Sequence, residues 1–140
     1  MVSKYTGAGC YMFINELEQV IYIGSAKDID RRLKSHFNGK QGHLGNEVYS
    51  KVARVYICKC KDYPTALALE QYAINKYKPK YNKRDKSNNI DSKVVANNEY
   101  YEKLINWQLY YKLKSLDKEK IKTNKKLDRA LMAIAYTIFI

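Results

Sequence analysis

The sequence predicts a small α+β domain. We expect a three-stranded, mostly antiparallel sheet flanked by helices in the order ββαβα, followed by further helices toward the C-terminus. Two observations carry this prediction. Short runs of strand-forming residues alternate with segments in which apolar residues recur every three or four positions. At 140 residues, the chain has the length of one domain with a short extension.

The first two expected strands form a hairpin. Residues 10–14 read Cys-Tyr-Met-Phe-Ile, and residues 20–23 read Val-Ile-Tyr-Ile. Residues 15–19 are polar and have the length of a hairpin connection. Gly24 follows the second run, and we expect the strand to end there.

A basic helix is expected next, over residues 28–37. Asp28 is a suitable N-cap residue. Three cations recur at helical spacing and share one face: Lys27, Arg31 and Lys34. Arg32 and His36 are four residues apart, so they share a neighbouring face. A strand that leads into a helix with these side chains is suited to binding phosphate.

The remaining core elements are a strand and a helix. Residues 53–60 alternate in polarity and predict the third strand. Asp62 to Thr65 contains a capping residue and an early proline, which is typical of a helix start. Apolar residues at helical spacing continue to Tyr77, and Lys78-Pro79 should end the helix.

The C-terminal part differs in composition. Residues 87–99 are polar and rich in asparagine, so we expect a linker between a domain at 1–86 and a helical extension at 100–140. Residues 100–116 are aromatic-rich and helix-like. The apolar stripe in residues 127–138 has the spacing of an amphipathic helix. This stripe could pack on the domain, join two copies into a homodimer, or make the chain an interaction protein.

Composition favours a polyanionic partner. The net charge is +12, and the chain has 14 tyrosines. Basic residues interleaved with aromatic ones suit nucleic acid first and an acidic membrane surface second. A protein that is merely rich in lysine is the third interpretation, because net charge governs association and not fold.

The cysteines and the apolar tracts indicate a reduced, cytoplasmic setting. There are three cysteines and no C-x-x-C pair, so we expect free thiols and no structural zinc site. Residues 1–9 lack the apolar run of a signal peptide. The longest apolar tract, residues 131–140, is too short to span a bilayer, so we expect no membrane partner.

An ordered set of residues resembles the signature of the GIY-YIG nuclease superfamily. The set comprises Gly9-Cys10-Tyr11, Tyr22-Ile23-Gly24, Arg32 eight residues after Gly24, His36 twelve after it, Glu70 within a helix, and Asn82 after Lys78-Pro79-Lys80-Tyr81. The resemblance covers residues 7–84, and residues 22–37 look most similar to phage intron homing endonucleases. Cys10 departs from the isoleucine usual in the family. Because neighbours on a strand face opposite ways, Cys10 should point away from Tyr11 and preserve the fold.

The resemblance implies a metal-dependent DNA endonuclease that acts on double-stranded DNA. It implies catalytic roles for Tyr11, Tyr22, Arg32, His36 and Glu70. The expected nucleic-acid contacts are Lys27, Arg31, Lys34, Lys40, His43 and Asn82. Lys40 and His43 lie in a glycine-rich loop that could cover a site, and Asn82 is implied to position groups or contact phosphate.

The residue types also suit this chemistry by themselves. Glu70 offers one hard oxygen ligand for Mg²⁺, with Mn²⁺ as a substitute, and a single carboxylate argues against a two-metal site. Arg32 can bind phosphate oxygens with its fork of donors. Tyr11 or Tyr22 could be the general base. The ordinary tyrosine pKa of about 10 must then be lowered, or the proton passed on, and His36 could move it. The alternative function is a catalytically silent nucleic-acid-binding module on the same fold.

Overall fold

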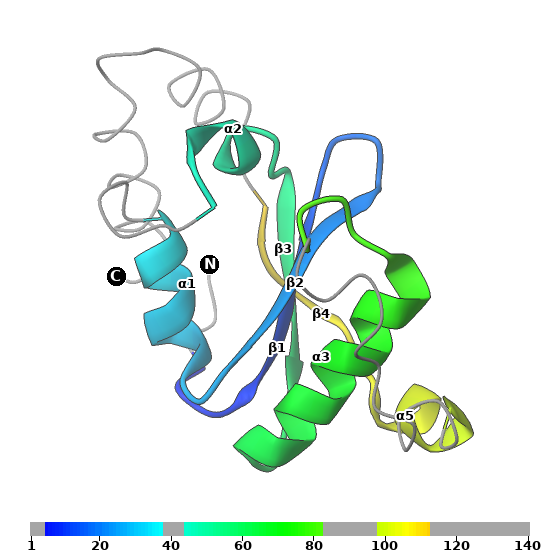
Figure 1. Ribbon diagram of the computed structural model, residues 1–140. Helices are drawn as coiled ribbons and strands as arrows, with labels where there is room; N and C mark the ends of the chain where they lie inside the picture. Colours follow the sequence, from blue (N-terminus) through cyan, green and yellow to red (C-terminus); the bar gives the residue numbers. More distant parts are fainter. Residues whose placement is uncertain (1–4, 38–43, 83–97, 113–140) are drawn as a thin grey trace.

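The computed structural model describes residues 5–37, 44–82 and 98–112 (Figure 1). Its strands are β1 (Gly9–Ile14), β2 (Val20–Ala26), β3 (Arg54–Lys59) and β4 (Gln108–Lys112). Its helices are α1 (Ile29–Phe37), α2 (Asn46–Tyr49), α3 (Tyr63–Tyr77) and α5 (Asn98–Leu104). The α+β class and the order ββαβα are confirmed, with the short helix α2 added before β3.

The four strands form one antiparallel sheet in the order β2-β1-β3-β4. Helices α1 and α3 lie on opposite sides of it (Figure 1). The expectation of three strands is therefore one strand short. None of the helices in the described ranges is long and apolar enough to cross a membrane.

The fourth strand comes from a segment that we expected to be helical. Within residues 100–116, α5 ends at Leu104 and residues 108–112 pair with β3. Tyr110 and Tyr111 are buried there, so pairing covers the edge of β3 and adds two aromatic rings to the core. The predicted domain division remains a prediction, because residues 83–97 and 113–140, with most of the linker and the apolar stripe, lie outside the described residues.

The helix ends follow the expected capping chemistry. The Asp28 carboxylate accepts a hydrogen bond of 3.1 Å from the Arg31 backbone N–H, which caps α1. Asp62 accepts one of 2.8 Å from the Thr65 backbone N–H, which caps α3. At the other end of α3, Lys78 adopts a left-handed conformation with φ 47° and stops the helix. These starts and stops were predicted correctly.

Gly24 does not end β2. The strand continues to Ala26, and Gly24 pairs directly with Tyr11 on β1. A Cβ atom at position 24 would approach the Tyr11 Cε2 atom to 2.9 Å and its hydroxyl end more closely still. Glycine is required here because the Tyr11 ring lies across the strand.

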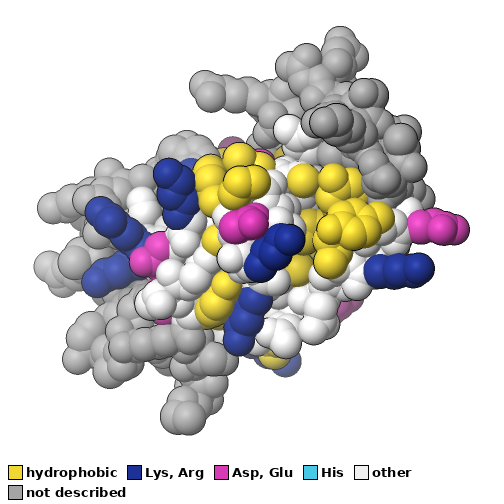
Figure 2. Space-filling view, turned by 90° about the horizontal axis from the view of Figure 1, so that it is seen from below, with side chains coloured by type: hydrophobic (Ala, Val, Ile, Leu, Met, Phe, Trp, Pro, Cys, Tyr) yellow, Lys and Arg dark blue, Asp and Glu magenta, His cyan; other side chains and the backbone are white. Residues whose placement is uncertain are grey.

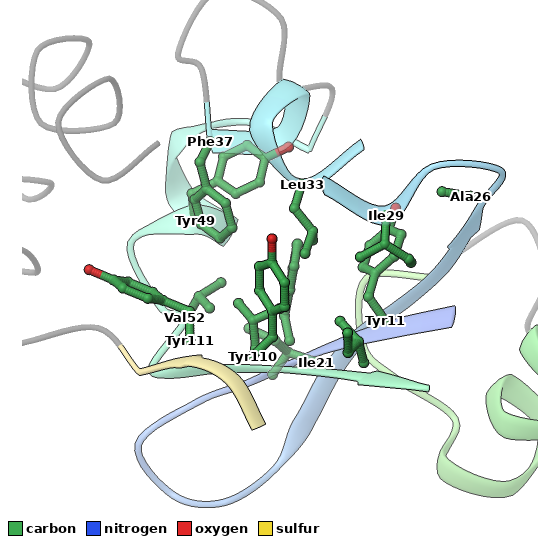
Figure 3. Packing of buried hydrophobic residues seen from close by; sticks show 13 residues of the cluster. Tyr11, Ile21, Ala26, Ile29, Leu33, Phe37, Tyr49, Val52, Tyr110 and Tyr111 are labelled. Atoms are coloured by element: carbon green, nitrogen blue, oxygen red, sulfur yellow. The ribbon is translucent and has the colours of Figure 1, made fainter. Parts of the chain in front are cut away.

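The two faces of β1 have different neighbours. Tyr11 and Phe13 belong to a large cluster with Leu33 and Phe37 of α1, in which Figure 3 labels several of the packed rings. On the other face, Met12 and Ile14 pack against α3, and Cys10 is packed against α3 residues nearby. Cys10 points away from Tyr11, as expected.

A buried carboxylate joins the sheet to α1. Asp30 accepts hydrogen bonds from the Tyr5 backbone N–H at 2.8 Å and from the Tyr110 hydroxyl. These contacts tie the start of the chain and strand β4 to the first turn of α1. They fix the position of α1 against the sheet, and with it the positions of Arg32 and His36.

Candidate active site

Tyr11 is the centre of a polar network inside the α1 face. Its hydroxyl oxygen lies 2.6 Å from His36 Nε2 and accepts a hydrogen bond of 3.3 Å from Arg32 Nε. Tyr11 is 0% exposed and His36 is 1% exposed. The prediction that Arg32 and His36 share a helix face is confirmed, because both reach the same tyrosine from α1.

The sequence did not identify Tyr49 as part of this network. Its hydroxyl lies 2.7 Å from His36 Nδ1, and it accepts a hydrogen bond of 3.4 Å from the Leu44 backbone N–H. A neutral imidazole carries one N–H, so one of the two tyrosines donates to His36 and the other accepts. No sequence signal marked Tyr49, which lies thirteen residues after His36 on the separate helix α2.

Burial controls the protonation of both tyrosines. It raises the pKa of Tyr11 well above 10, helped by Tyr22 and by the charge of Glu70 and opposed by the hydrogen bond from Arg32. Burial raises the pKa of Tyr49 to about 12. Desolvation lowers the pKa of Arg32, but the hydrogen bond to Tyr11 and the electrostatic effects of the neighbouring tyrosines together outweigh it, so the net pKa is raised. Neutral tyrosines and a cationic arginine are therefore the resting state.

Tyr22 lies beside this network at the edge of the sheet. Its ring centroid is 6.2 Å from that of Tyr11 and 5.7 Å from that of His36. The residue is half-buried, whereas Tyr11 is fully enclosed. Solvent therefore reaches Tyr22 first, and the fold brings both candidate bases together.

Glu70 approaches the network from the opposite helix. It is half-buried on α3, and its charge contributes to the raised pKa of Tyr11. Among the described residues, no group of three or more His, Cys, Asp or Glu side chains could hold a metal ion. A single carboxylate still fits Mg²⁺, which keeps several waters and needs only one or two protein carboxylates. It does not fit a structural zinc site, which takes four protein ligands.

Asn82 is buried against the backbone of β2. It is 4% exposed; its Oδ1 accepts from Ile23 N at 2.9 Å and its Nδ2 donates to Ile23 O at 2.7 Å. Both ends of its amide thus bind the free edge of β2. This arrangement supports the positioning role that was one of the two roles expected of Asn82, and its contact with nucleic acid remains a prediction.

The expected DNA-binding cations differ in placement. Arg31 and Lys34 are exposed on α1, and exposed Lys27 holds its ammonium 5.4 Å above the Tyr63 ring. Lys40 and His43 lie outside the described residues. On the face seen in Figure 2, lysine and arginine side chains are spread among apolar areas and are not gathered into one stripe.

Comparison with known proteins gives a consistent result. Residues 7–82 match the family model described as the GIY-YIG catalytic domain. UvrABC system protein C of Mycoplasmoides gallisepticum is 35% identical over 97 residues, which cover 69% of this chain and 16% of that protein. The same protein of Borreliella burgdorferi is 30% identical over 126 residues, covering 90% of this chain and 21% of that protein. The chain thus spans only a small part of these relatives.

Solved structures resemble the same region. The GIY-YIG N-terminal endonuclease domain of UvrC from Thermotoga maritima, bound to its catalytic divalent cation magnesium, has a TM-score of 0.52 and 28% identity. The match covers 58% of this chain and 89% of that domain. A point mutant of that domain with phenylalanine in place of one tyrosine, bound to its catalytic divalent cation, has a TM-score of 0.53 and 30% identity.

Proposed function

We propose, from the premise that this chain belongs to the family of GIY-YIG catalytic domains, that it is a DNA endonuclease that hydrolyses phosphodiester bonds with the help of a divalent metal. One observation carries the proposal. Arg32, Tyr11 and His36 form a hydrogen-bonded chain, with the charge of Glu70 close by. Buried titratable groups that shift one another's pKa in this way are typical of catalytic sites.

Arg32 is assigned to the phosphate. Its bond to Tyr11 uses only Nε, so the N–H groups of its two terminal nitrogens can face phosphate oxygens. The guanidinium would stabilise the negative charge that grows on the phosphate during attack by water. Arg32 would therefore contact both the bound phosphate and Tyr11, the proposed general base, so binding of DNA and activation of Tyr11 involve the same side chain.

Tyr11 is assigned as the general base, with His36 as the acceptor of its proton. The 2.6 Å contact lets the Tyr11 proton pass to His36 Nε2 as Tyr11 takes a proton from the attacking water. The resulting imidazolium can donate from Nδ1 to Tyr49. Because Tyr11 is fully buried, water reaches it only after a neighbouring side chain moves. Half-buried Tyr22 is therefore retained as the second candidate base.

Glu70 is assigned as the metal ligand, with Mg²⁺ as the ion and Mn²⁺ as a substitute. A cation bound there would supply positive charge beside the scissile phosphate. The Thermotoga maritima domain, crystallised with magnesium, supports the choice of ion. Exposed Lys27, Arg31 and Lys34 would bind the backbone of double-stranded DNA without reading its sequence.

The biological setting is proposed at a coarser level. The relatives described above are UvrC proteins, so they lend no support to the expected closeness to phage homing endonucleases. That link remains a hypothesis based on residues 22–37 alone. A cytoplasmic setting and a homodimer formed through residues 127–138 are likewise retained as proposals. Light scattering of the chain with and without residues 113–140 tests the dimer.

Nicking of a supercoiled plasmid tests the function. We expect nicking with Mg²⁺ and none with a chelator. Glu70→Ala should lose nicking but keep DNA binding, because it removes the metal ligand and leaves the cations in place. Glu99→Ala, which removes an exposed carboxylate from α5, is the matched control and should nick normally. Binding without nicking by the unaltered chain would favour the silent nucleic-acid-binding alternative, and wild-type rates in Glu70→Ala would refute the metal assignment.

A further inference from the structure

An open hollow of about 880 Å³ lies at the end of the sheet where β1 turns into β2. One wall is the β1–β2 turn, and the other is the C-terminal end of α3 with the segment after it (Figure 1). The side chains of interest along it are Lys51, Lys78, Lys80, Tyr77 and Tyr81. None of these was among the residues expected to bind nucleic acid.

The hollow has an excess of positive charge. Its one acidic lining residue, Glu18, is already paired with the guanidinium of Arg54. Lys51 binds the Tyr81 hydroxyl at 2.9 Å and Glu47 at 3.3 Å. Lys78 and Lys80 are exposed and form no salt bridge with any described residue. Two ammonium groups are therefore available to an anion.

Both walls are fixed by local hydrogen bonds. In the turn, the Asn15 carboxamide oxygen accepts from the Leu17 and Gln19 backbone N–H groups at 3.0 and 2.9 Å. On the opposite wall, the Lys78 N–H donates to Ile74 O at 2.8 Å, and the Tyr81 N–H donates to Ile21 O at 3.0 Å. A preformed site loses little conformational freedom when it binds a ligand.

The position of the hollow relates it to the proposed active site. Both lie along β2: Ile21 lines the hollow, and the Tyr11 ring lies against Gly24. Three residues of strand span about 10 Å. A DNA duplex rises about 3.4 Å per base pair, so this distance corresponds to about three base pairs.

We propose that this hollow binds backbone phosphates of the DNA duplex about three base pairs from the scissile bond, and so aligns the duplex along β2. The inference rests on the proposed function and adds a second contact surface to it. Lys78 and Lys80 carry the contact, and the exposed Tyr77 ring forms part of its rim. The cations of α1 would hold the duplex elsewhere along its length.

A double variant, Lys78→Ala with Lys80→Ala, tests this surface in the full chain. The probe is a fluorescent DNA duplex of about 30 base pairs, titrated over a range of salt concentrations without metal. Loss of two phosphate contacts should weaken binding about tenfold or more at low salt and reduce the slope of log K against log salt by about two. With Mg²⁺ and saturating DNA, kcat should stay unchanged while KM rises.

The matched control is Lys61→Ala with Lys103→Ala, which removes the same charge from exposed positions that do not line the hollow. It should change the Kd by less than about twofold. Equal affinity and salt slope in the two double variants would overturn the hollow as a binding site. If the unaltered chain binds DNA but does not cleave it, the endonuclease proposal fails. Comparison of the Kd values of the two double variants still tests whether the hollow binds DNA.

Discussion

The two faces of strand β1 show how one strand separates chemistry from packing. Tyr11 and Phe13 point toward α1, where Tyr11 meets His36 and Arg32. Met12 and Ile14 point toward α3 and make only apolar contacts in their cluster. The alternation of side chains along a strand produces this division.

The comparison shows why each face tolerates different changes. On the α1 face, the bulk of the Tyr11 ring fills the core and its hydroxyl carries the proposed chemistry, so removing one oxygen separates the two roles. On the α3 face, the β1 side chains Met12 and Ile14 contribute packing volume and no proposed chemistry, so substitutions within their apolar cluster should change stability alone. Gly24 serves both the packing and the proposed chemistry of Tyr11, because the absence of a side chain at position 24 leaves room for the Tyr11 ring.

Tyr11→Phe should give the largest effect. It keeps the ring and removes the hydroxyl, so we expect kcat to fall by about 100- to 10,000-fold, as for loss of a general base. Loss of the buried hydrogen bond between Tyr11 and His36 should cost about 1–3 kcal/mol in the free energy of unfolding. Single-turnover cleavage and urea denaturation measure the two effects. If Tyr22→Phe loses cleavage and Tyr11→Phe does not, the base is Tyr22.

Arg32→Ala tests the same face through its cation. Loss of a group that stabilises charge in the transition state should lower kcat by about 100- to 1,000-fold. The affinity for DNA should change much less, because exposed Lys27, Arg31 and Lys34 remain. Cleavage rates at saturating DNA, together with a separate binding titration, separate the two quantities. A change in Kd with kcat unaltered would assign Arg32 to positioning.

Ile74→Ala tests the opposite face. Ile74 is buried on α3 and packs in the cluster that contains Met12 and Ile14. The cavity left by the substitution should lower the free energy of unfolding by about 2–5 kcal/mol. The kcat of the folded fraction should match that of the unaltered chain at 25 °C. Urea denaturation and cleavage assays check this, and a large loss of kcat in folded protein would break the division between the faces.

Tyr49→Phe should have a smaller effect, about tenfold on kcat, for one lost hydrogen bond to His36. The imidazolium formed when His36 takes a proton would lose its acceptor at Nδ1. The charged imidazolium should therefore be less favoured, and the acid limb of the kcat–pH profile should shift to lower pH. A purely structural role would lower the melting temperature and leave the position of that limb unchanged.

Asp62→Ala should give the smallest effect, and only on stability. The bond from Thr65 lowers the pKa of Asp62 below its ordinary 3.8, so the charged form stabilises the cap of α3. The advantage of the unaltered chain should be complete above about pH 4 and should fade as pH falls through the lowered pKa. Urea midpoints at neutral and acidic pH measure this difference. Asp62→Asn is the control, because asparagine also caps helices but does not titrate.

Local chemistry was predictable from the sequence. The hairpin, the third strand and the capped helices depend on residues within a few positions of one another, and all were located correctly apart from the end of β2, which lies at Ala26. The four-residue spacing of Arg32 and His36 was enough to place both on one helix face. The direction of Cys10, away from Tyr11, followed from strand alternation alone.

Contacts across the fold were not predictable in the same way. Tyr49 joins His36, Asn82 binds both backbone groups of Ile23, and residues 108–112 add a strand where a helix was expected. Each joins segments that are distant in the sequence. Their pairing depends on which surfaces meet once the core has formed, and no local pattern encodes that.

By itself, the sequence determined the hairpin, the third strand, the two capped helices and which residue types could cut a phosphodiester bond, because periodicity, caps and side-chain chemistry are local properties. Only the tertiary structure decided that Tyr11 is buried between Arg32 and His36, that Gly24 makes room for its ring, and that Asn82 binds the backbone of β2. Those outcomes depend on register and packing between distant segments.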